Sequence, residues 1–328
     1  MPPQMIGDRA TDRQGTGRWF VRAAISASAL GVLAMHIDRH KLIDEIASLS
    51  PVWIIAAAFL AIAQVIAAAQ RWHYVNSALD IFVSRIETLR ILMFGLLIGQ
   101  VLPASIGCDA TRAWLIFRAG RKLKEAVAGV VLDRAIGLVV LAAIIAGGFP
   151  RLLTGWESSE PVAMVGASAA MLLVGAALSI LLLPRITHLA ERFPAGEKIK
   201  SVLDAATAAL CAPTTLGLVL LLSVINHGCS IAIMYLLANG LGASFSVAAA
   251  IIFVPPILLA SALPISIGGW GIREGAAVIL LGQAGLTQAQ ALAVSVTYGA
   301  TSLLPAMIGG GVWLTGGWKS VGRSPPRA

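Results

Sequence analysis

Apolar residues dominate this chain in long blocks, which shorter polar segments separate. A helix needs about 20 apolar residues to cross the hydrocarbon core of a bilayer, and eight blocks come close to that length or exceed it. They cover residues 19–37, 52–69, 88–106, 126–149, 162–183, 215–238, 246–263 and 288–314. Because a spanning segment must satisfy its own backbone hydrogen bonds, the pattern predicts an all-α, polytopic membrane helix bundle.

The bundle is predicted to form a single integral membrane domain over residues 19–315. The polar tail before it, residues 1–18, is expected to be disordered, and a short basic tail, residues 316–328, follows it. A ninth and shorter apolar piece, residues 276–284, is too short to span a bilayer by itself.

One stretch of the chain occurs twice, each time at the end of an apolar block. LPASIGCDATR (102–112) and LPISIGGWGIR (263–273) share Leu, Pro, Ser, Ile, Gly and Arg at the same spacing, offset by 161 residues. Proline and glycine interrupt helices, so both stretches are expected to break the apolar segment before them. The recurrence predicts two internal repeats, at about 88–149 and 246–314, and such repeats are common in transporters.

The basic residues indicate how the two stretches are arranged. If all eight blocks crossed the membrane with the N-terminus inside, the basic loops 107–125 and 185–213 would lie outside, against the positive-inside rule. If both stretches are instead the tips of re-entrant hairpins, most of the 24 lysines and arginines lie in the cytoplasm, including those of segment 70–90. We therefore predict about six full spans, two broken-helix hairpins and two cytoplasmic termini.

The two hairpins would enter from opposite faces, so the repeats are predicted to be inverted, with tips that meet near mid-membrane. Non-helical backbone at that depth is tolerated where it lines a cavity, so a polar cavity is expected between the tips. The residues assigned to the turns are small or helix-breaking. They are Pro103, Ser105, Gly107, Pro264, Ser266, Gly268, Gly269 and Gly271.

Asp133 and Arg134 place charge deep inside an apolar block, at a cost of about 2.5–3.5 kcal/mol for each residue. Adjacent helical residues do not face each other, so each needs a partner from elsewhere. The candidate partners are the charged residues of the two tips. They are Asp109, Arg112, Arg273 and Glu274. Two interpretations remain open, a buried ion-pair lock and a site for a phosphate or lipid headgroup, which arginine binds in a bidentate way.

Other polar residues inside the apolar blocks are expected to have structural roles. Asn226 and His227 lie midway along one block, where a hydrogen bond to a neighbouring helix is favoured over a proton-carrying role for the histidine. Gln64, Gln70 and Gln100 are interpreted as packing or interface residues.

Composition excludes several classes of protein. Hydrophobic residues make up 58% of the chain and charged residues 12%, about half the charged share of a soluble domain. The net charge of +8 does not indicate a nucleic-acid partner, because the basic residues lie in short loops that the positive-inside rule explains. Three cysteines without a CxxC motif predict neither a disulfide framework nor a zinc site.

The sequence contains no recognisable catalytic constellation. There is no Ser–His–Asp set, paired-carboxylate cleft, HExxH motif or Cys/His cluster, and GGWGIRE (268–274) lacks the GK[ST] of a nucleotide-binding loop. We therefore predict no catalytic residue, no metal site and no cofactor, and the sequence gives little direct support for enzymatic chemistry.

The motifs at the two tips resemble those of the transmembrane-region family of lysylphosphatidylglycerol synthases, whose members are often called flippase-like membrane proteins. The family pattern is P-x-x-x-G-G-D-x-x-R, then D-R, then P-x-x-x-G-G-x-G-x-R-E. The matching residues are Pro103, Gly107, Asp109 and Arg112, then Asp133 and Arg134, then Pro264, Gly268, Gly269, Gly271, Arg273 and Glu274. Cys108 stands where the family usually has a second glycine, and it is also small.

The resemblance implies a lipid translocase of the bacterial cytoplasmic membrane, acting on a phospholipid, aminoacyl-lipid, glycolipid or isoprenoid lipid. In full-length synthases of this kind the membrane region moves the modified lipid, and a separate soluble domain performs the aminoacyl transfer. This chain ends at Ala328, about fourteen residues after its last apolar block, so we expect the translocating half alone.

Two alternative functions stay open at this point. The chain could be the membrane subunit of a lipid-modifying enzyme such as a lysylphosphatidylglycerol synthase, or that enzyme itself. It could also be a non-transporting scaffold of a lipid-pathway complex. The expected partners are membrane lipids and, for the alternatives, a soluble or membrane-bound enzyme of lipid biosynthesis. No oligomeric state is predicted.

Overall fold

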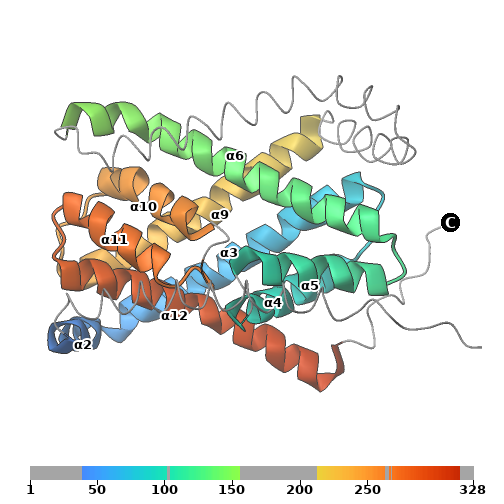
Figure 1. Ribbon diagram of the computed structural model, residues 1–328, viewed down its shortest axis with the longest axis horizontal. Helices are drawn as coiled ribbons and strands as arrows, with labels where there is room; N and C mark the ends of the chain where they lie inside the picture. The colour runs from blue at the N-terminus through green and yellow to red at the C-terminus, as the bar shows by residue number, and fades with distance from the viewer. Residues whose placement is uncertain (1–38, 102–103, 156–212, 263–265, 267, 318–328) are drawn as a thin grey trace, which may run out of the picture.

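The computed structural model describes residues 39–101, 104–155, 213–262, 266 and 268–317 (Figure 1). Within these residues every regular element is a helix, as predicted. Several predicted features lie outside the described residues. They are the tail 1–18, the blocks 19–37 and 162–183, Pro103, Pro264 and residues 318–328 of the C-terminal tail.

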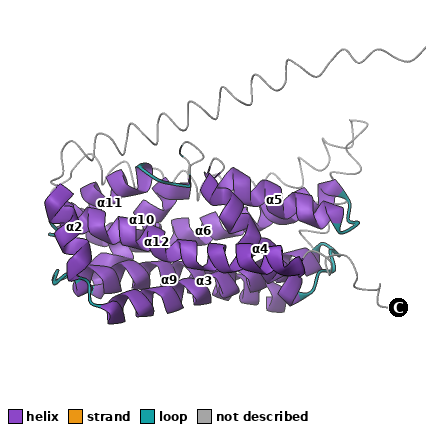
Figure 2. Cartoon of the chain, turned by 90° about the horizontal axis from the view of Figure 1, so that it is seen from below, coloured by secondary structure: helices purple, strands orange, loops and turns teal. Residues whose placement is uncertain are grey.

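Nine α-helices and one π-helical turn follow one another along the described part of the chain. They are α2 (Arg39–Ser48), α3 (Pro51–Ala78), α4 (Arg85–Val101), α5 (Ala104–Arg118), α6 (Leu123–Gly155), α9 (Pro213–Gly240), α10 (Val247–Ala262), α11 (Ile272–Gln283), α12 (Gln288–Val312) and η1 (Trp313–Gly317). Seen from below, these helices lie side by side in one bundle (Figure 2).

Four helices are long and apolar enough to cross a membrane: Pro51–Ala78, Leu123–Gly148, Pro213–Gly240 and Gln288–Thr315. A helix of 28 residues is about 42 Å long, which exceeds the hydrocarbon core of about 30 Å. Fewer than a third of the residues in the apolar windows of α3 and α9 are buried, and several large apolar side chains of both helices are exposed, as lipid-facing helices require. The chain is a multi-pass membrane protein.

Four further helices are too short to cross a bilayer with ease, and they pack as two pairs. Helices α4 and α5 have 17 and 15 residues, and α10 and α11 have 16 and 12, which corresponds to about 18–26 Å each. The first pair is α4 with α5, and the second pair is α10 with α11. Helices α4 and α10 fall in the interrupted blocks 88–106 and 246–263. Helix α5 occupies most of segment 107–125, which was wrongly predicted to be a loop, and α11 contains most of the short apolar piece 276–284.

The described helices repeat one order, long, short, short, long, as α3–α4–α5–α6 and again as α9–α10–α11–α12. Their packing follows the same scheme. Helix α6 contacts α5 of the first pair and α10 of the second, while α12 contacts α11 of the second pair and α4 of the first. Helices α3 and α9 pack against each other between the two sets. In Figure 1 the two short pairs lie towards opposite ends of the molecule.

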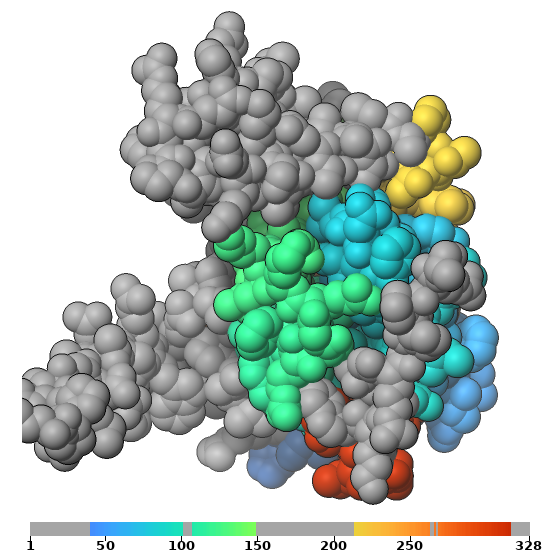
Figure 3. Space-filling model, turned by 90° about the vertical axis from the view of Figure 1, so that its right-hand side faces the viewer, coloured from blue at the N-terminus to red at the C-terminus, as the bar shows by residue number. Residues whose placement is uncertain are grey.

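Each short pair rests on its own hydrophobic core. Around the first pair, the largest buried side chains come from Trp72, Ile91, Leu115 and Ile116. Around the second pair, a larger cluster joins α10 and α11 to α6, α9 and α12. The C-terminal end of α12 also reaches the first pair, where Trp313 stacks on Phe94 with ring centres 3.8 Å apart. Figure 3 looks onto this end of the molecule and shows the end of α12, in red, below α5 and α6.

The two breaks differ in length and form. Helix α4 ends at Val101 and α5 begins at Ala104, so Ser105 and Gly107 lie in the first turns of α5 rather than in the turn itself. The second break runs from residue 263 to 271. Gly268, Gly269 and Gly271 there have φ values of 59°, 79° and 89°, a left-handed conformation that glycine adopts without strain.

The pair Pro255–Pro256 does not interrupt α10, which continues through both residues to Ala262. Both prolines are buried among the apolar residues of that helix. The break in the second pair therefore comes after these prolines, at the segment that contains Ser266 and the three glycines.

Candidate functional site

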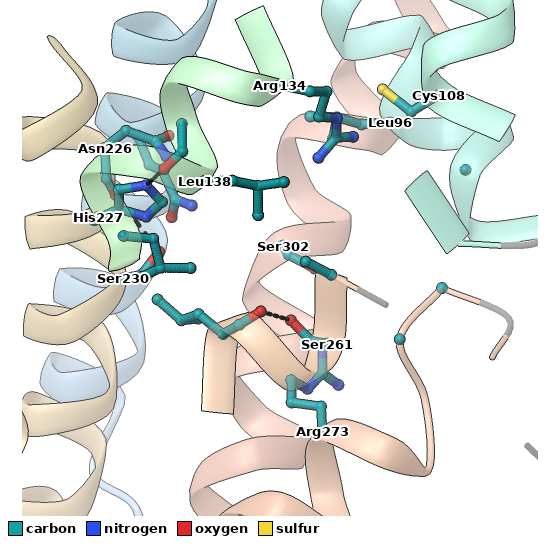
Figure 4. A pocket seen from close by; sticks show the side chains of 18 of the residues that line it. Leu96, Cys108, Arg134, Leu138, Asn226, His227, Ser230, Ser261, Arg273 and Ser302 are labelled. Carbon is teal, nitrogen blue, oxygen red and sulfur yellow. Dashed lines mark hydrogen bonds between the residues drawn. The ribbon is translucent and has the colours of Figure 1, made fainter. Parts of the chain in front are cut away.

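A cavity of about 320 Å³ lies between the two short pairs. Both pairs contribute to its wall, and the long helices α3, α6, α9 and α12 complete it. From the first pair the lining residues are Leu96, Gly99, Gln100 and Cys108, and from the second pair they are Leu258, Ser261, Ala262, Gly268, Gly269 and Arg273. Figure 4 shows this cavity from close by, with Arg134 and Arg273 on opposite sides of it.

The polar lining of the cavity is basic. Three arginines line it, Arg71 from α3, Arg134 from α6 and Arg273 from α11, together with His227 from α9. Among the described lining residues there is no aspartate or glutamate. The neutral polar residues of the wall are Gln64, Gln100, Asn226, Ser230, Ser261, Tyr298 and Ser302.

Behind one side of the cavity, five charged residues form what we call the first cluster: Arg71, Asp109, Arg112, Asp133 and Arg134. Asp133 is buried and accepts hydrogen bonds from two arginines, at 2.7 Å from Arg71 Nε and 2.8 Å from Arg112 Nη2. Asp109 accepts from Arg134 Nε, at 3.0 and 2.9 Å, and lies 3.4 Å from Arg112 Nη1. The first cluster thus ties together three helices that contribute to the cavity wall, α3, α5 and α6.

The local sequence of α6 explains how Asp133 and Arg134 reach different partners. Adjacent residues on a helix point about 100° apart, so Asp133 turns into the protein while Arg134 turns to Asp109 and the cavity. One turn later, Gly137 leaves room for Arg71. A Cβ atom at this position would lie 3.1 Å from Arg71 Nη1, closer than nearly all real contacts.

Arg112 belongs to the first cluster but does not line the cavity. It is buried, and its guanidinium carbon lies 4.0 Å from the ring centre of Trp72, which is also buried. Its contacts to Asp109, Asp133 and Trp72 hold α5 against α3 and α6. The geometry therefore gives Arg112 a positioning role behind the cavity wall.

At the other side of the cavity lies the second cluster, which consists of Trp270, Arg273, Glu274, Ser295 and Tyr298. Glu274 Oε1 accepts from Arg273 Nη2 at 2.6 Å, from Arg273 Nε at 3.0 Å and from Ser295 Oγ at 3.2 Å. Its other oxygen accepts the backbone N–H of Gly271 at 2.6 Å. The Arg273 guanidinium lies over the rings of Trp270 and Tyr298, at 4.6 and 5.6 Å.

A glycine makes space for the second cluster as well. A Cβ atom at Gly299 would collide with the Arg273 guanidinium and with Trp270. Each cluster therefore has one glycine on a long helix, Gly137 on α6 and Gly299 on α12, that leaves room for a buried arginine.

Helix α9 supplies the remaining polar wall of the cavity. His227 Nε2 donates to the carbonyl oxygen of Gly137 on α6, at 2.9 Å, so the predicted hydrogen bond to a neighbouring helix is confirmed for this histidine. Ser230 accepts from the Tyr298 hydroxyl of α12 at 3.1 Å. Figure 4 shows Asn226, His227 and Ser230 together on one side of the cavity.

The six charged residues selected from the sequence fall into three groups by their position relative to the cavity. Arg134 and Arg273 line the cavity. Arg112 lies behind it, and the three carboxylates of Asp109, Asp133 and Glu274 each hold one or two arginines. Arg273 pairs with Glu274 in its own helix and not with the first cluster.

Sequence reasoning missed Arg71, which the prediction counts among the cytoplasmic charges of segment 70–90. The structure places it inside α3, with 7% of its surface exposed, because that helix continues to Ala78. The signal that identifies it is the apolar spacing beyond it. Trp72, Val75 and Leu79 continue a helical stripe, and all three are buried.

The chemistry available at this site is recognition of charge. Guanidinium groups donate planar pairs of hydrogen bonds, which suit carboxylates and phosphates. Among the described residues, no group of three or more histidines, cysteines or carboxylates is placed to hold a metal ion.

Comparison with known protein families matches the chain to the family described as the lysylphosphatidylglycerol synthase TM region, over residues 19–310. A search of curated proteins gives no match. The match covers both clusters, both short pairs and the long helices between them.

Proposed function

The chain belongs to the lysylphosphatidylglycerol synthase TM-region family, and we propose that it is a lipid translocase of the bacterial cytoplasmic membrane. The lipid headgroup would enter the cavity between the two short pairs while the acyl chains stay in the bilayer. The observation that carries this proposal is a cavity lined by three arginines and shared by both halves of a membrane helix bundle.

We propose that each short pair is a re-entrant hairpin and that the two halves are inverted repeats. The repeated helix order and the exchange of packing partners between α6 and α12 support this arrangement. So does the basic loop after α5, which the positive-inside rule assigns to the cytoplasm. Transporters with this construction bind their substrates between the repeats, where broken helices meet.

The apolar surfaces of the long helices are the second support. Val52, Ile55 and Phe59 of α3 and Leu221 and Val224 of α9 are all exposed. Apolar side chains on the outside of a membrane helix contact lipid tails. The acyl chains of a lipid bound at the cavity would therefore remain among apolar side chains and neighbouring lipid tails. The proposed movement then carries only the polar part of the lipid through the protein.

Transport by purified protein in liposomes tests this proposal. Fluorescent lipids with several headgroups are added, and the fraction that becomes accessible from outside is followed with an impermeant quencher. We expect faster movement of at least one headgroup than in empty liposomes. Arg134→Gln is expected to slow that movement, and the matched control Arg85→Gln, at an exposed arginine outside the cavity, is not. Equal rates with and without the protein, across all headgroups, would refute the proposal.

The topology has its own test. Lys122→Cys places a thiol on the exposed turn between α5 and α6, a segment that we assign to the cytoplasm. An impermeant thiol reagent should label it in inside-out vesicles beyond the wild-type background, and should not label it in intact cells. Labelling from outside intact cells would exclude the double-hairpin topology.

The family match also favours a second candidate, the membrane subunit of an aminoacyl-lipid synthase. A soluble transferase that co-purifies with this chain, and whose activity falls when the chain is removed, would support that role. Activity of the transferase without this chain would leave translocation as the function to test.

A further inference from the structure

We propose that the cavity selects a lipid headgroup whose charge is carried by phosphate oxygens and which has no ammonium group. A phosphomonoester such as phosphatidic acid is the simplest case. This inference rests on the proposed function, since it takes a lipid as the ligand, and it names the substrate class. It excludes the cationic aminoacyl headgroups that the family description brings to mind for a relative of a lysylphosphatidylglycerol synthase.

The first support is the imbalance of charge between the cavity wall and the protein behind it. Arg71, Arg134 and Arg273 line the cavity, and no described lining residue is acidic. The carboxylates that balance these arginines lie on their far side. The surface that a ligand meets is therefore more basic than the clusters taken as a whole.

The second support is that the three carboxylates of the two clusters do not line the cavity and that each already holds an arginine. Asp133 gives one oxygen to Arg71 and the other to Arg112. The two oxygens of Asp109 share the Nε–H of Arg134, and Asp109 lies outside the cavity wall. Glu274, which is fully buried, gives one oxygen to Arg273 and Ser295 and the other to the backbone of Gly271.

The third support is the set of donors that remains. Arg134 uses only Nε on Asp109, so its two amino groups have no partner among the described residues, and its side chain is 40% exposed. Arg273 commits Nε and Nη2 to the second cluster, and Arg71 commits Nε and Nη1 to Asp133 and Ser223. Each therefore keeps one amino group without a described partner.

Together these groups form a divided site for oxygen anions. In Figure 4 the Arg134 guanidinium points into the cavity from one side, and Arg273 lies at the other. Phosphate oxygens can accept from the amino groups on either side of the cavity, whereas an ammonium group would face three cations in a wall without a described carboxylate. The preference for phosphate and the rejection of ammonium thus come from the same residues.

Lipid retention by the full-length protein measures this selectivity. The protein is reconstituted in a bilayer with equal amounts of phosphatidic acid, phosphatidylglycerol, phosphatidylcholine and lysylphosphatidylglycerol, then re-extracted gently, and the retained lipids are quantified by mass spectrometry. We expect phosphatidic acid to be enriched about tenfold or more over lysylphosphatidylglycerol, with phosphatidylglycerol between them, because a charge-assisted hydrogen bond changes binding by about that factor.

Three variants assign the effect to the cavity. Arg134→Gln should lower the enrichment of phosphatidic acid about tenfold, and Arg134→Lys should restore part of it, since lysine keeps the charge without the planar fork. Arg85→Gln, the exposed control outside the cavity, should retain lipid as the wild type does. Arg134 is chosen because its side chain is partly exposed, so its loss leaves the buried pairs of Asp133 intact.

The possible results separate the two proposals. Retention of lysylphosphatidylglycerol or phosphatidylcholine equal to that of phosphatidic acid would overturn the inference, and so would unchanged retention by Arg134→Gln. Displacement of phosphatidic acid by an equal concentration of glycerol 3-phosphate would overturn the lipid source, because it would assign the site to a soluble phosphate. Selective retention of phosphatidic acid without transport in liposomes would support this inference and refute the translocase function. Transport of a cationic lipid would support the translocase function and refute this inference.

Discussion

The two clusters on opposite sides of the cavity hold similar arginines in different ways. In the first cluster the carboxylate of Asp133 comes from α6, while its two arginines come from α3 and α5. In the second cluster Glu274 is the chain neighbour of the arginine that it holds, and Ser295 of α12 is the added contact. The first cluster therefore forms only when three helices have assembled, whereas most of the second is formed within the start of α11.

This difference teaches that a repeated sequence motif need not preserve its network of contacts. Both copies place an arginine at the same position of the motif, Arg112 and Arg273. Arg112 is covered by Trp72 behind the wall, and Arg273 lies at the cavity. In the first half of the molecule, the arginines that line the cavity as Arg273 does are Arg71 and Arg134. Neither of them belongs to the repeated stretch.

Removal of the shared carboxylate in the first cluster is expected to have the largest effect. Asp133→Asn leaves the buried Arg71 without a described carboxylate and Arg112 with only the longer contact to Asp109, and breaking a buried pair in this way costs about 3–5 kcal/mol of unfolding free energy. Unfolding in detergent, by heat or by added denaturing surfactant, measures the loss. The control is Glu125→Gln, whose pair with Lys122 is at the surface and contributes at most about 1 kcal/mol. A loss no greater than that of the control would show that the first cluster does not stabilise the assembly.

The corresponding change in the second cluster should cost less. Glu274→Gln keeps an amide oxygen that can accept from Gly271 or Arg273, and it exposes one arginine rather than two to the loss of counter-charge. We expect about 1–3 kcal/mol, the usual penalty for a weakened buried hydrogen-bond set. The same unfolding measurement compares the two variants. If Glu274→Gln is as damaging as Asp133→Asn, the contrast between an assembled and a local cluster is wrong.

The glycines beside the arginines offer a steric version of the comparison. Gly299→Ala brings a methyl group onto the Arg273 guanidinium, so we expect a loss of about 1–3 kcal/mol together with reduced retention of phosphatidic acid. Gly137→Ala meets Arg71 less closely and should cost less. Gly311→Ala, on the same helix as Gly299 but with no atom within 4 Å of the added carbon, is the matched control. Equal losses of unfolding free energy for Gly299→Ala, Gly137→Ala and Gly311→Ala would show that Arg273 and Arg71 shift away from the added methyl group at no cost.

The smallest expected effect concerns the hydroxyl that joins α12 to α9. Tyr298→Phe removes the hydrogen bond to Ser230 and keeps the ring beside Arg273, so we expect a loss of about 0.5–1.5 kcal/mol. Tyr74→Phe is the control, because its hydroxyl accepts from Arg85 in an exposed contact. Unfolding of both variants and of the Tyr298→Phe, Ser230→Ala double variant gives the coupling between the two residues. Additive losses would contradict the hydrogen bond.

The pairing of the first cluster was predictable because adjacent helical residues point about 100° apart, which disfavours a pair between Asp133 and Arg134. This is a tendency and not a rule, since the adjacent residues Arg273 and Glu274 do pair on α11. Partners for Asp133 and Arg134 were therefore expected on other helices, and the sequence has few charged residues near the tips. The predicted partners Arg112 and Asp109 are confirmed. Arg71 was not predictable from block length alone, because the apolar block before it ends at residue 69 and the helix does not.

The positions of the breaks were predictable only in part. Proline and glycine indicate where a helix is weak, but tertiary packing decides whether it ends there. Helix α10 continues through Pro255–Pro256, which are buried, and α5 includes Gly107. The left-handed glycines of the second break are the part of the pattern that backbone geometry requires, since other residues are strained at positive φ.

The way in which α6 and α12 each hold one member of both short pairs limits how the protein can move. Each pair also contacts one further long helix, α3 in the case of α4 and α9 in the case of α10, but a displacement of either pair still acts on α6 and α12, which contact both pairs. The wall of the cavity belongs to the same two helices, through Arg134 and Gly137 on one and Tyr298 and Ser302 on the other. A movement that widens the cavity on one side is therefore expected to change its width on the opposite side, because α6 and α12 connect the two sides.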